Sequence, residues 1–284
     1  MAHHITGLDH AVLAAADLEA ARATYRKLGF TLTPRGRHIG WATGNYCIMF
    51  GGNYLELLGI AEPGGFTAGL EETVQRRGEG VHKLVLGIDD AAAARASLVA
   101  EGIAASEVQD LKRALELPEG TVMPAFSLVH LPAEATPQTS MFLCQHLTPG
   151  LLRRPEWLIH PNGAENLAGV VVVAEDPPSL EMPYERLLGA GSAVRTDRMI
   201  AARTGAETIL FVTEDDLATL FPDLDHPPRS TPYIAGLRFG VHNPDAAAAY
   251  FEAVGVEHAR SLDGTVLVPA SAAHGCFLEF SARL

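Results

Sequence analysis

The chain has 284 residues, of which 48% are hydrophobic and 19% are charged, a composition typical of packed globular proteins and too apolar for a disordered chain. Its formal net charge of -13 opposes binding to nucleic acid or to an anionic membrane surface, because both partners select basic patches. The length predicts two domains, each large enough to bury a core.

The cysteines Cys47, Cys144 and Cys276 are widely spaced and odd in number, so they predict neither a disulfide framework nor a cysteine-based zinc motif. The longest apolar run, near residues 167–174, is far shorter than the roughly 20 residues that cross a bilayer. The first residues also lack the basic-then-apolar pattern of an export signal. We therefore expect a cytoplasmic protein without a membrane partner.

The first predicted strand covers residues 8–15 and is followed by Asp17, a residue type that favours the N-cap of a helix. An alanine-rich helix then runs to Gly29, since glycine commonly ends a helix. Three further β-prone segments follow at residues 30–33, 40–50 and 54–58. The first unit is thus a strand, a helix and three more strands.

The same order recurs three more times along the chain. The first strands of these units are predicted at residues 81–88, 167–174 and 234–241. Their helices begin at Asp89 or Asp90, at Glu175 or Asp176, and at Asn243, and they end at Gly102, Gly189 and Gly255. Four copies of one β-α-β-β-β unit predict an α+β protein built by internal repetition.

Residues 147–164 contain Pro149, Pro155 and Pro161 without a regular period, which is typical of a connection between domains. We therefore predict a first domain at residues 1–146 and a second domain at residues 165–284.

Two histidines, His10 and His82, occupy nearly equivalent positions in the first two units, 19 and 20 residues before the glycine that ends each helix. Strand alternation places His10 on the face of Leu8 and Val12, and His82 on the face of Leu84. Both imidazoles are therefore expected to point inward. A hydrogen-bonded core histidine is the alternative reading of each, but their matching positions favour a shared site.

Glu56 lies on the fourth predicted strand of the first unit, on the same face as Tyr54 and Leu58. A buried carboxylate is unfavourable unless it is paired or bound to a cation. Two imidazoles and one carboxylate would leave coordination positions open on a divalent metal, and zinc, iron, manganese or nickel would each be acceptable. The predicted ligands are thus His10, Glu56 and His82.

The repeated unit opens with Gly-Leu-Asp-His-Ala-Val at Gly7 and continues to Tyr-Leu-Glu at Tyr54. In this it resembles the vicinal oxygen chelate superfamily, and within it the glyoxalase-like proteins. The resemblance implies four β-α-β-β-β units paired into two cupped, mixed-sheet domains, with a divalent metal between first and fourth strands. Members include glyoxalases, extradiol dioxygenases, epimerases and metal-free proteins of the bleomycin-resistance type, so the fold alone does not select a reaction.

The resemblance also implies a fourth ligand on the last strand of the second unit, where the sequence reads Phe-Leu-Cys-Gln-His at residues 142–146. The glyoxalase-like pattern places Gln145 at the ligand position, whereas alignment with Tyr-Leu-Glu turns Cys144 and His146 inward. The two alignments differ by one residue and therefore by sheet face. We favour Gln145 as the ligand and assign His146 to substrate binding. A neutral amide cannot serve as a general base, which argues against glyoxalase I activity.

Arg37 and His38 follow a proline-containing turn and are predicted to bind an anionic substrate group, because arginine suits carboxylates. A solvated hairpin turn is the alternative. In the second half no histidine stands at the positions equivalent to His10 and His82, so we expect no metal there. Glu279, which copies Glu56, is expected to face solvent or to pair with an arginine.

Together these features predict a metal-dependent enzyme of lyase, isomerase or dioxygenase type that acts on a small oxygen-rich organic substrate. The substrate would bind the metal through adjacent oxygens. The alternative is a metal-free small-molecule binding protein of the drug-resistance type. The expected partners are this small molecule and, where the chain self-associates, a second copy in a homodimer. No residue is assigned a catalytic role at this level.

Overall fold

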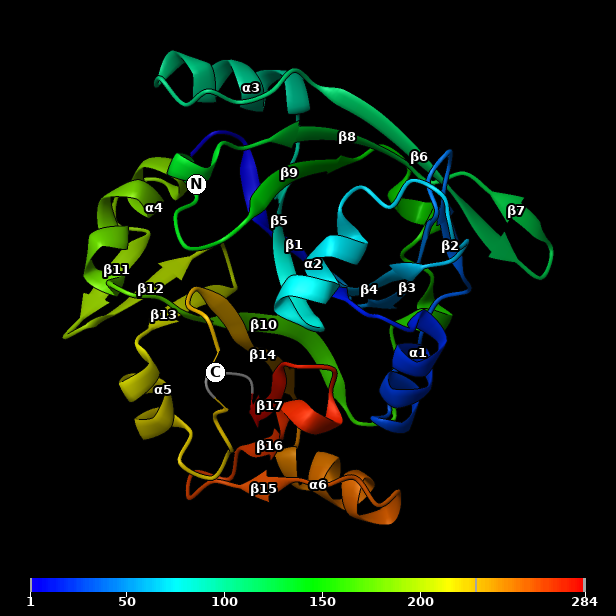
Figure 1. Ribbon diagram of the computed structural model, residues 1–284, viewed down its shortest axis with the longest axis vertical. Coiled ribbons are helices and arrows are strands. Elements are labelled where there is room, and N and C mark those ends of the chain that lie inside the picture. Colours follow the sequence, from blue (N-terminus) through cyan, green and yellow to red (C-terminus); the bar gives the residue numbers. More distant parts are fainter. Residues whose placement is uncertain (1, 228, 283–284) are drawn as a thin grey trace.

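The computed structural model describes residues 2–227 and 229–282. Within them the strands form two mixed sheets, one from each half of the chain (Figure 1). The predicted α+β fold of two cupped sheets is confirmed. Among the described helices, none is long and apolar enough to cross a membrane.

The first half contains the predicted units with one additional helix, α2, between them. Its elements are β1 (Ile5–Ala14), α1 (Leu18–Lys27), β2 (Gly36–His38), β3 (Thr43–Met49), β4 (Tyr54–Ile60), α2 (Leu70–Arg77), β5 (Gly80–Ile88), α3 (Ala91–Ala100), β6 (Gln109–Leu117), β7 (Gly120–Val122), β8 (Ala125–His130) and β9 (Met141–His146). Asp17 and Asp90 cap α1 and α3, because each carboxylate accepts hydrogen bonds from N–H groups of the first turn. Of the two aspartates considered for α3, the N-cap is therefore Asp90.

The second half repeats this order. Its elements are β10 (Ala164–Val173), α4 (Glu181–Leu188), β11 (Ala193–Thr196), β12 (Met199–Arg203), β13 (Thr208–Val212), α5 (Glu214–Leu220), β14 (Tyr233–Val241), α6 (Pro244–Ala253), β15 (Ala259–Arg260), β16 (Val266–Val268) and β17 (Phe277–Ala282). Asn243 caps α6 by accepting from the N–H of Asp245. The third helix is preceded by a 3₁₀ turn at Pro177–Leu180, so α4 begins four residues later than Pro177 suggests.

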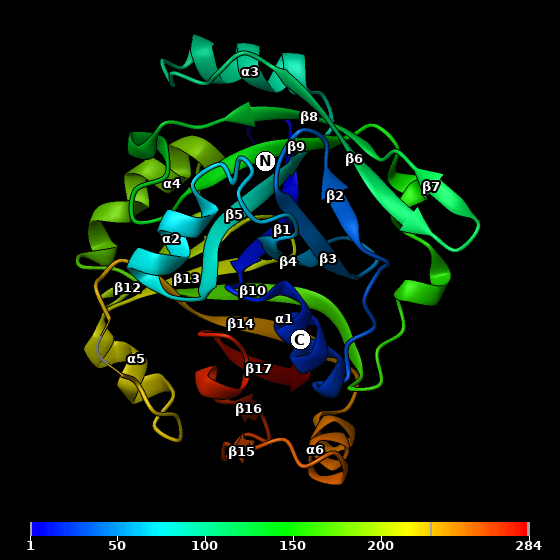
Figure 2. The same cartoon turned by 45° about the vertical axis from the view of Figure 1, so that its right-hand side comes forward.

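The first sheet closes on itself. Its strand order is β2-β3-β4-β1-β5-β9-β8-β6-β7, and β2 also pairs with β6, where His38 lies opposite Arg113 (Figure 2). Strands β1 to β6, β8 and β9 thereby form what we call the N-terminal barrel. The second sheet, in the order β11-β12-β13-β10-β14-β17-β16-β15, has no closing pair between its edges within the described residues.

One continuous apolar core joins the two halves. It contains residues from the helices and from the outer faces of both sheets. The Phe30 ring of the first half lies 5.1 Å from the Phe239 ring of the second, and the Tyr25 hydroxyl donates to the carbonyl of Ala273. Because residues of both halves belong to one buried apolar cluster, the two sheets pack against each other.

Candidate active site in the N-terminal barrel

A group of polar side chains lies buried inside the N-terminal barrel, whose wall is otherwise apolar. The apolar wall includes Val12, Met49 and Val85. The polar side chains are Asp9, His10, Asn45, Glu56, Arg113 and His146. Buried ionisable groups are unfavourable unless they are paired, so such a concentration in one interior marks a candidate functional site.

A β-bulge in β1 directs two neighbouring residues into the barrel. In the pairing of β1 with β5, Leu8 lies opposite Leu86 and His10 lies opposite Val85, so Asp9 is the extra residue. Leu8 consequently packs in the core between the sheets, whereas Asp9 and His10 are both buried inside. The prediction that Leu8 shares a face with His10 was wrong, because simple alternation assumes an unbroken strand.

The carboxylate of Asp9 binds two histidines. Its Oδ2 lies 2.7 Å from Nδ1 of His10 and 3.0 Å from Nε2 of His146, and an ionised carboxylate can only accept, so both imidazoles donate. Burial raises the pKa of Asp9, but the hydrogen bonds from His10 and His146 hold it well below its usual range. Asp9 therefore stays ionised and determines which nitrogen of His10 carries the proton.

The opposite nitrogen of His10 faces Glu56. Its Nε2 lies 3.6 Å from Oε2 of Glu56, and the ring is stacked on Tyr54 with centroids 4.2 Å apart. Since Nδ1 donates to Asp9, Nε2 of a neutral His10 presents a lone pair to a carboxylate. This arrangement favours a metal cation between the two groups.

Glu56 is held by a hydrogen-bonded chain that ends in a buried guanidinium. Nδ2 of Asn45 donates to Oε1 of Glu56, and Nη1 of Arg113 donates to Oδ1 of Asn45. Burial raises the pKa of Glu56, but the charges of His10, His38 and Arg113 and the Asn45 bond together bring it below its usual value. Glu56 is therefore an anion at neutral pH.

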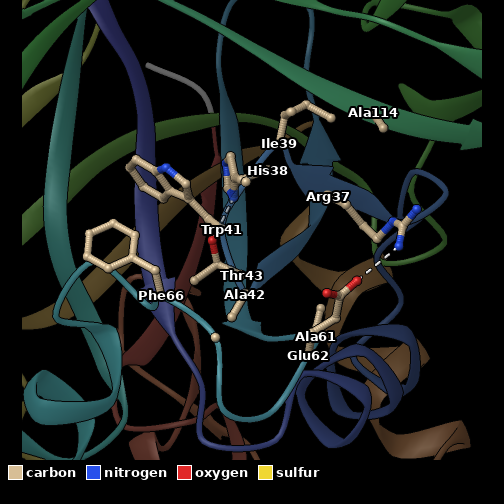
Figure 3. Close-up of a pocket in the computed structure, with 12 residues that line it drawn as sticks. Arg37, His38, Ile39, Trp41, Ala42, Thr43, Ala61, Glu62, Phe66 and Ala114 are labelled. Carbon is tan, nitrogen blue, oxygen red and sulfur yellow. Dashed lines mark hydrogen bonds and ion pairs between the residues drawn. The ribbon is translucent and has the colours of Figure 1, made fainter.

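A surface cavity of about 390 Å³ opens beside this interior, next to the β2–β6 seam. His38 and Thr43 line it, and Nδ1 of His38 lies 2.9 Å from the Thr43 hydroxyl (Figure 3). Burial lowers the pKa of His38, and the nearby Glu56 only partly opposes this effect, so the imidazole is neutral at pH 7. His38 thus lines the cavity and is close enough to Glu56 for their charges to interact.

Of the four predicted ligands, the structure brings His10 and Glu56 together but leaves His82 elsewhere. In the pairing of β1 with β5, Val12 lies opposite Lys83 and Leu13 lies opposite Val81, so His82 is the extra residue of another β-bulge. Its Nε2 lies 2.9 Å from the carbonyl oxygen of Gly78. His10 pairs with Val85, so His82 is roughly 10 Å further along β5. His10 and His82 therefore do not share a site, although they stand at nearly equivalent positions in their units.

Gln145 lies on the outer side of β9. Its Oε1 accepts from the N–H of Ala91 and its Nε2 donates to the carbonyl of Asp89, so it binds the start of α3. Cys144 and His146 face the barrel instead. The preference for Gln145 as the inward residue was wrong, and the alternative alignment describes the strand.

Arg37 lies at the rim of the cavity and is already paired. Its guanidinium is 3.1 Å from Glu62 and 2.9 Å from Glu116. Two carboxylates neutralise the charge that was expected to bind an anionic substrate group. His38 lines the cavity as expected of a substrate-binding residue, whereas His146 lies in the interior against Asp9.

Three site residues were not found from the sequence: Asp9, Asn45 and Arg113. Asp9 was hidden because alternation assigns it to the opposite face from His10, and nothing in the local sequence marks the bulge. Arg113 comes from β6 and reaches Asn45 and Cys47 only because the barrel closes. Only pairing over long sequence distances assembles this part of the site.

The donor atoms fit a divalent cation between His10 and Glu56. Two ligands bound at about 2.1 Å to a tetrahedral metal are about 3.4 Å apart, close to the observed 3.6 Å. Asp9 on the far nitrogen of His10 is also the usual outer partner of a metal-bound imidazole.

A second group of metal-type donors lies on the other side of His10. The ligand atoms of Asp9, Cys144 and His146 lie within 4.8 Å of one another, the one such group of three among the described residues. Nδ1 of His146 is buried without a hydrogen-bond partner. Burial, followed by the charges of Asp9 and Glu56, raises the pKa of the Cys144 thiol, so the sulfur is protonated unless a cation is bound.

The second sheet holds no comparable polar interior in the part of the chain that is described. Its concave face is covered by apolar side chains from α5 and the segment after it, namely Leu217, Phe221 and Leu224. Glu279 is paired there with Arg238 through two hydrogen bonds of 2.8 and 3.0 Å, which confirms the expectation of an arginine partner.

A barrel with an acid–imidazole interior, packed against an open sheet that repeats the same order of strands and helices, agrees with the architecture of the vicinal oxygen chelate type. Residues 8–188 match the model of the glyoxalase-like domain family. This is more than half of the chain, so the protein belongs to the glyoxalase-like domain family. The resemblance noted from the sequence is therefore confirmed.

Solved structures with the same fold include three that match nearly the whole chain. A hypothetical protein from Staphylococcus aureus has a TM-score of 0.67 at 11% identity, covering 97% of this chain and 99% of that chain. A variant of 4-hydroxymandelate synthase from Streptomyces coelicolor has a TM-score of 0.61 at 15% identity, covering 100% and 95%. A xylose isomerase-like TIM barrel/4-hydroxyphenylpyruvate dioxygenase fusion protein has a TM-score of 0.56 at 12% identity, covering 99% and 49%.

At these identities the similarity shows the fold alone. A comparison with curated protein sequences found no significant match.

Proposed function

We propose that this protein is a metal-dependent enzyme that acts on a small, oxygen-rich organic substrate inside the N-terminal barrel. The observation that carries the proposal is the 3.6 Å separation of His10 Nε2 and Glu56 Oε2, with Asp9 bound to the other nitrogen of His10. The glyoxalase-like family and the dioxygenase and synthase named among the structural neighbours agree with a metal-dependent reaction.

In this proposal His10 and Glu56 hold the metal, and Asp9 fixes the tautomer of His10. A bound divalent cation would supply Lewis-acid polarisation of adjacent substrate oxygens. Arg113 and Asn45 keep Glu56 ionised and correctly oriented. The apolar wall of the barrel excludes bulk water, which strengthens these electrostatic interactions. We further propose that residues 165–284 bind no metal and support the first domain.

His38 would control the approach from the cavity. It is neutral, it is hydrogen-bonded to Thr43, it lines the cavity, and it interacts electrostatically with Glu56. A neutral imidazole can accept a proton from a substrate hydroxyl or donate a hydrogen bond to a carbonyl. Lyase, isomerase and dioxygenase outcomes are all compatible with these groups, and they are separated by assays run under argon and in air.

One observation favours the alternative of a metal-free small-molecule binding protein. Arg113 is a permanent buried cation connected to Glu56 through Asn45, so the negative charge of Glu56 is partly balanced without a metal. Two of the four predicted ligands, His82 and Gln145, also lie outside the site.

The decisive experiment is metal analysis of untagged protein, as purified and after anaerobic loading with zinc, iron(II), manganese or nickel. Near-stoichiometric metal that is lost in His10→Gln and Glu56→Gln but kept in His82→Ala supports the proposal. His82→Ala is the matched control, since that histidine lies outside the barrel interior.

Two other outcomes contradict the proposal as stated. Metal that is lost in Cys144→Ser and kept in Glu56→Gln would assign it to the group of Asp9, Cys144 and His146. No metal under any loading condition, with all variants folded, would leave the metal-free binding protein.

A further inference from the structure

Three large apolar side chains are exposed together around the cavity over His38. Ile39, Trp41 and Phe66 are 57%, 37% and 63% exposed, and all three line the cavity. The rings of Trp41 and Phe66 meet edge to face with centroids 5.7 Å apart, and both lie on one side of the cavity (Figure 3). Clustered apolar exposure of this kind is typical of a surface that a ligand covers.

The charged groups on the opposite side of the cavity cancel one another. Arg37 pairs with Glu62 and Glu116, and Glu116 also pairs with Arg35 at 3.4 Å. Two guanidinium groups balance two carboxylates in this network, and the two of them that line the cavity, Arg37 and Glu62, carry no net charge together. An anionic ligand would find no free cation here and would also meet the overall negative charge of the chain.

The floor of the cavity offers a neutral hydrogen-bonding group. Nδ1 of His38 is engaged with Thr43, while its Nε2 has no protein partner among the residues that the structure describes. The volume of about 390 Å³ is well above the roughly 150 Å³ of a cavity that holds benzene, so a substituted ring fits.

We propose that this cavity binds a neutral aromatic molecule whose ring contacts Trp41 and Phe66 and whose carbonyl or hydroxyl oxygen hydrogen-bonds to His38. This inference rests on the proposed function, because it names the class of substrate that the enzyme of the N-terminal barrel would bind. Binding itself requires only the cavity, so it can be measured whether or not a metal is present.

The test uses three probes of nearly equal size and ligand-observed NMR titration of the full-length protein. Acetophenone is neutral and aromatic, cyclohexyl methyl ketone lacks the aromatic ring, and benzoate carries a negative charge. Acetophenone is expected to bind about fivefold more tightly than cyclohexyl methyl ketone, because ring contacts are lost in the latter. Benzoate is expected to bind more weakly than acetophenone at low salt.

Variants assign the binding to this cavity. Trp41→Ala and Phe66→Ala should each weaken acetophenone binding about fivefold, while Leu262→Ala, which removes a fully exposed apolar side chain elsewhere, should leave it unchanged. Thermal unfolding of each variant establishes that it is folded. Protein treated with a chelator should bind acetophenone as the untreated protein does, which separates ligand binding from metal binding.

Equal binding of all three probes, or binding that Trp41→Ala and Phe66→Ala leave intact, would overturn the inference. Preferential binding of benzoate would overturn the neutral-ligand part of it. If acetophenone does not bind and Trp41→Ala converts a dimer to a monomer, the apolar cluster covers a second copy of the chain and the inference is wrong. None of these outcomes depends on whether His10 and Glu56 bind metal.

Discussion

Nε2 of His10 faces Oε2 of Glu56 across 3.6 Å, and the other nitrogen of His10 donates to Asp9. The imidazole is therefore enclosed between two buried carboxylates, one beside each of its ring nitrogens. His146 donates to the same Asp9 oxygen, so the three groups form one hydrogen-bonded unit. The properties of this unit give the first prediction.

Asp9→Asn should weaken metal binding about 10-fold to 100-fold, because the amide no longer orients and polarises His10 as a carboxylate does. The measurement is a competition titration with zinc and a chromophoric chelator. Asp216→Asn is the control, since it alters a carboxylate of the second half that is bound to Arg198. Unchanged affinity in Asp9→Asn would mean that His10 is not a ligand.

Arg113→Met should lower the free energy of unfolding by about 3–5 kcal/mol, because it leaves the Asn45–Glu56 chain buried without its cation. Urea unfolding with an unchanged m-value measures the loss. Arg198→Met, which breaks an exposed ion pair with Asp216, should cost about 1 kcal/mol or less. Adding Glu56→Gln to Arg113→Met should recover part of the loss, whereas strictly additive effects would argue against coupling of the two groups.

His160 should make stability fall as the pH drops from about 6.5 to 4. Its Nδ1 accepts a hydrogen bond from the N–H of Thr31, and its Nε2 donates one to the carbonyl of Met49. Protonation of Nδ1 would replace the first hydrogen bond with a contact between two N–H groups. Burial lowers the pKa of His160 to about 4, although the Met49 bond acts in the opposite direction. As the pH falls, His160 therefore takes up a proton in the unfolded chain before it does so in the folded chain. The free energy of unfolding falls by about 3 kcal/mol between pH 6.5 and 4.

Urea unfolding at several pH values, compared with His160→Gln, tests this prediction. Glutamine can accept and donate at the same two positions without titrating, so the variant should lose the part of the pH dependence that lies between 6.5 and 4. If the free energy of unfolding depends on pH in the same way in both proteins, His160 is not the cause of the pH dependence.

Gln145→Ala should lower stability by about 1 kcal/mol and leave metal content unchanged, because Gln145 satisfies backbone groups at the start of α3. Far-UV circular dichroism during unfolding and metal analysis of the same preparations measure the two effects. Loss of metal in this variant would contradict the position of Gln145 outside the barrel.

Local signals in the sequence determined most of the fold. Asp17, Asp90 and Asn243 are N-caps because their short side chains reach the free N–H groups of the next turn, an interaction that depends on a few adjacent residues. The repeated order of strand and helix signals likewise predicted the β-α-β-β-β units, and the family resemblance implied that they pair into two cupped sheets. His10 and Glu56 could be selected because a buried imidazole and carboxylate stand out in apolar strands.

Tertiary structure decided which polar groups meet. The bulges at Asp9 and His82 arise from the pairing of β1 with β5, and a strand read alone does not reveal where its partner skips a residue. Closure of β2 onto β6 brings Arg113 beside His38, although 75 positions separate them in sequence. The sequence by itself thus determined the elements and two residues of the site, while long-range strand pairing decided their faces and neighbours, because register is a property of two strands together.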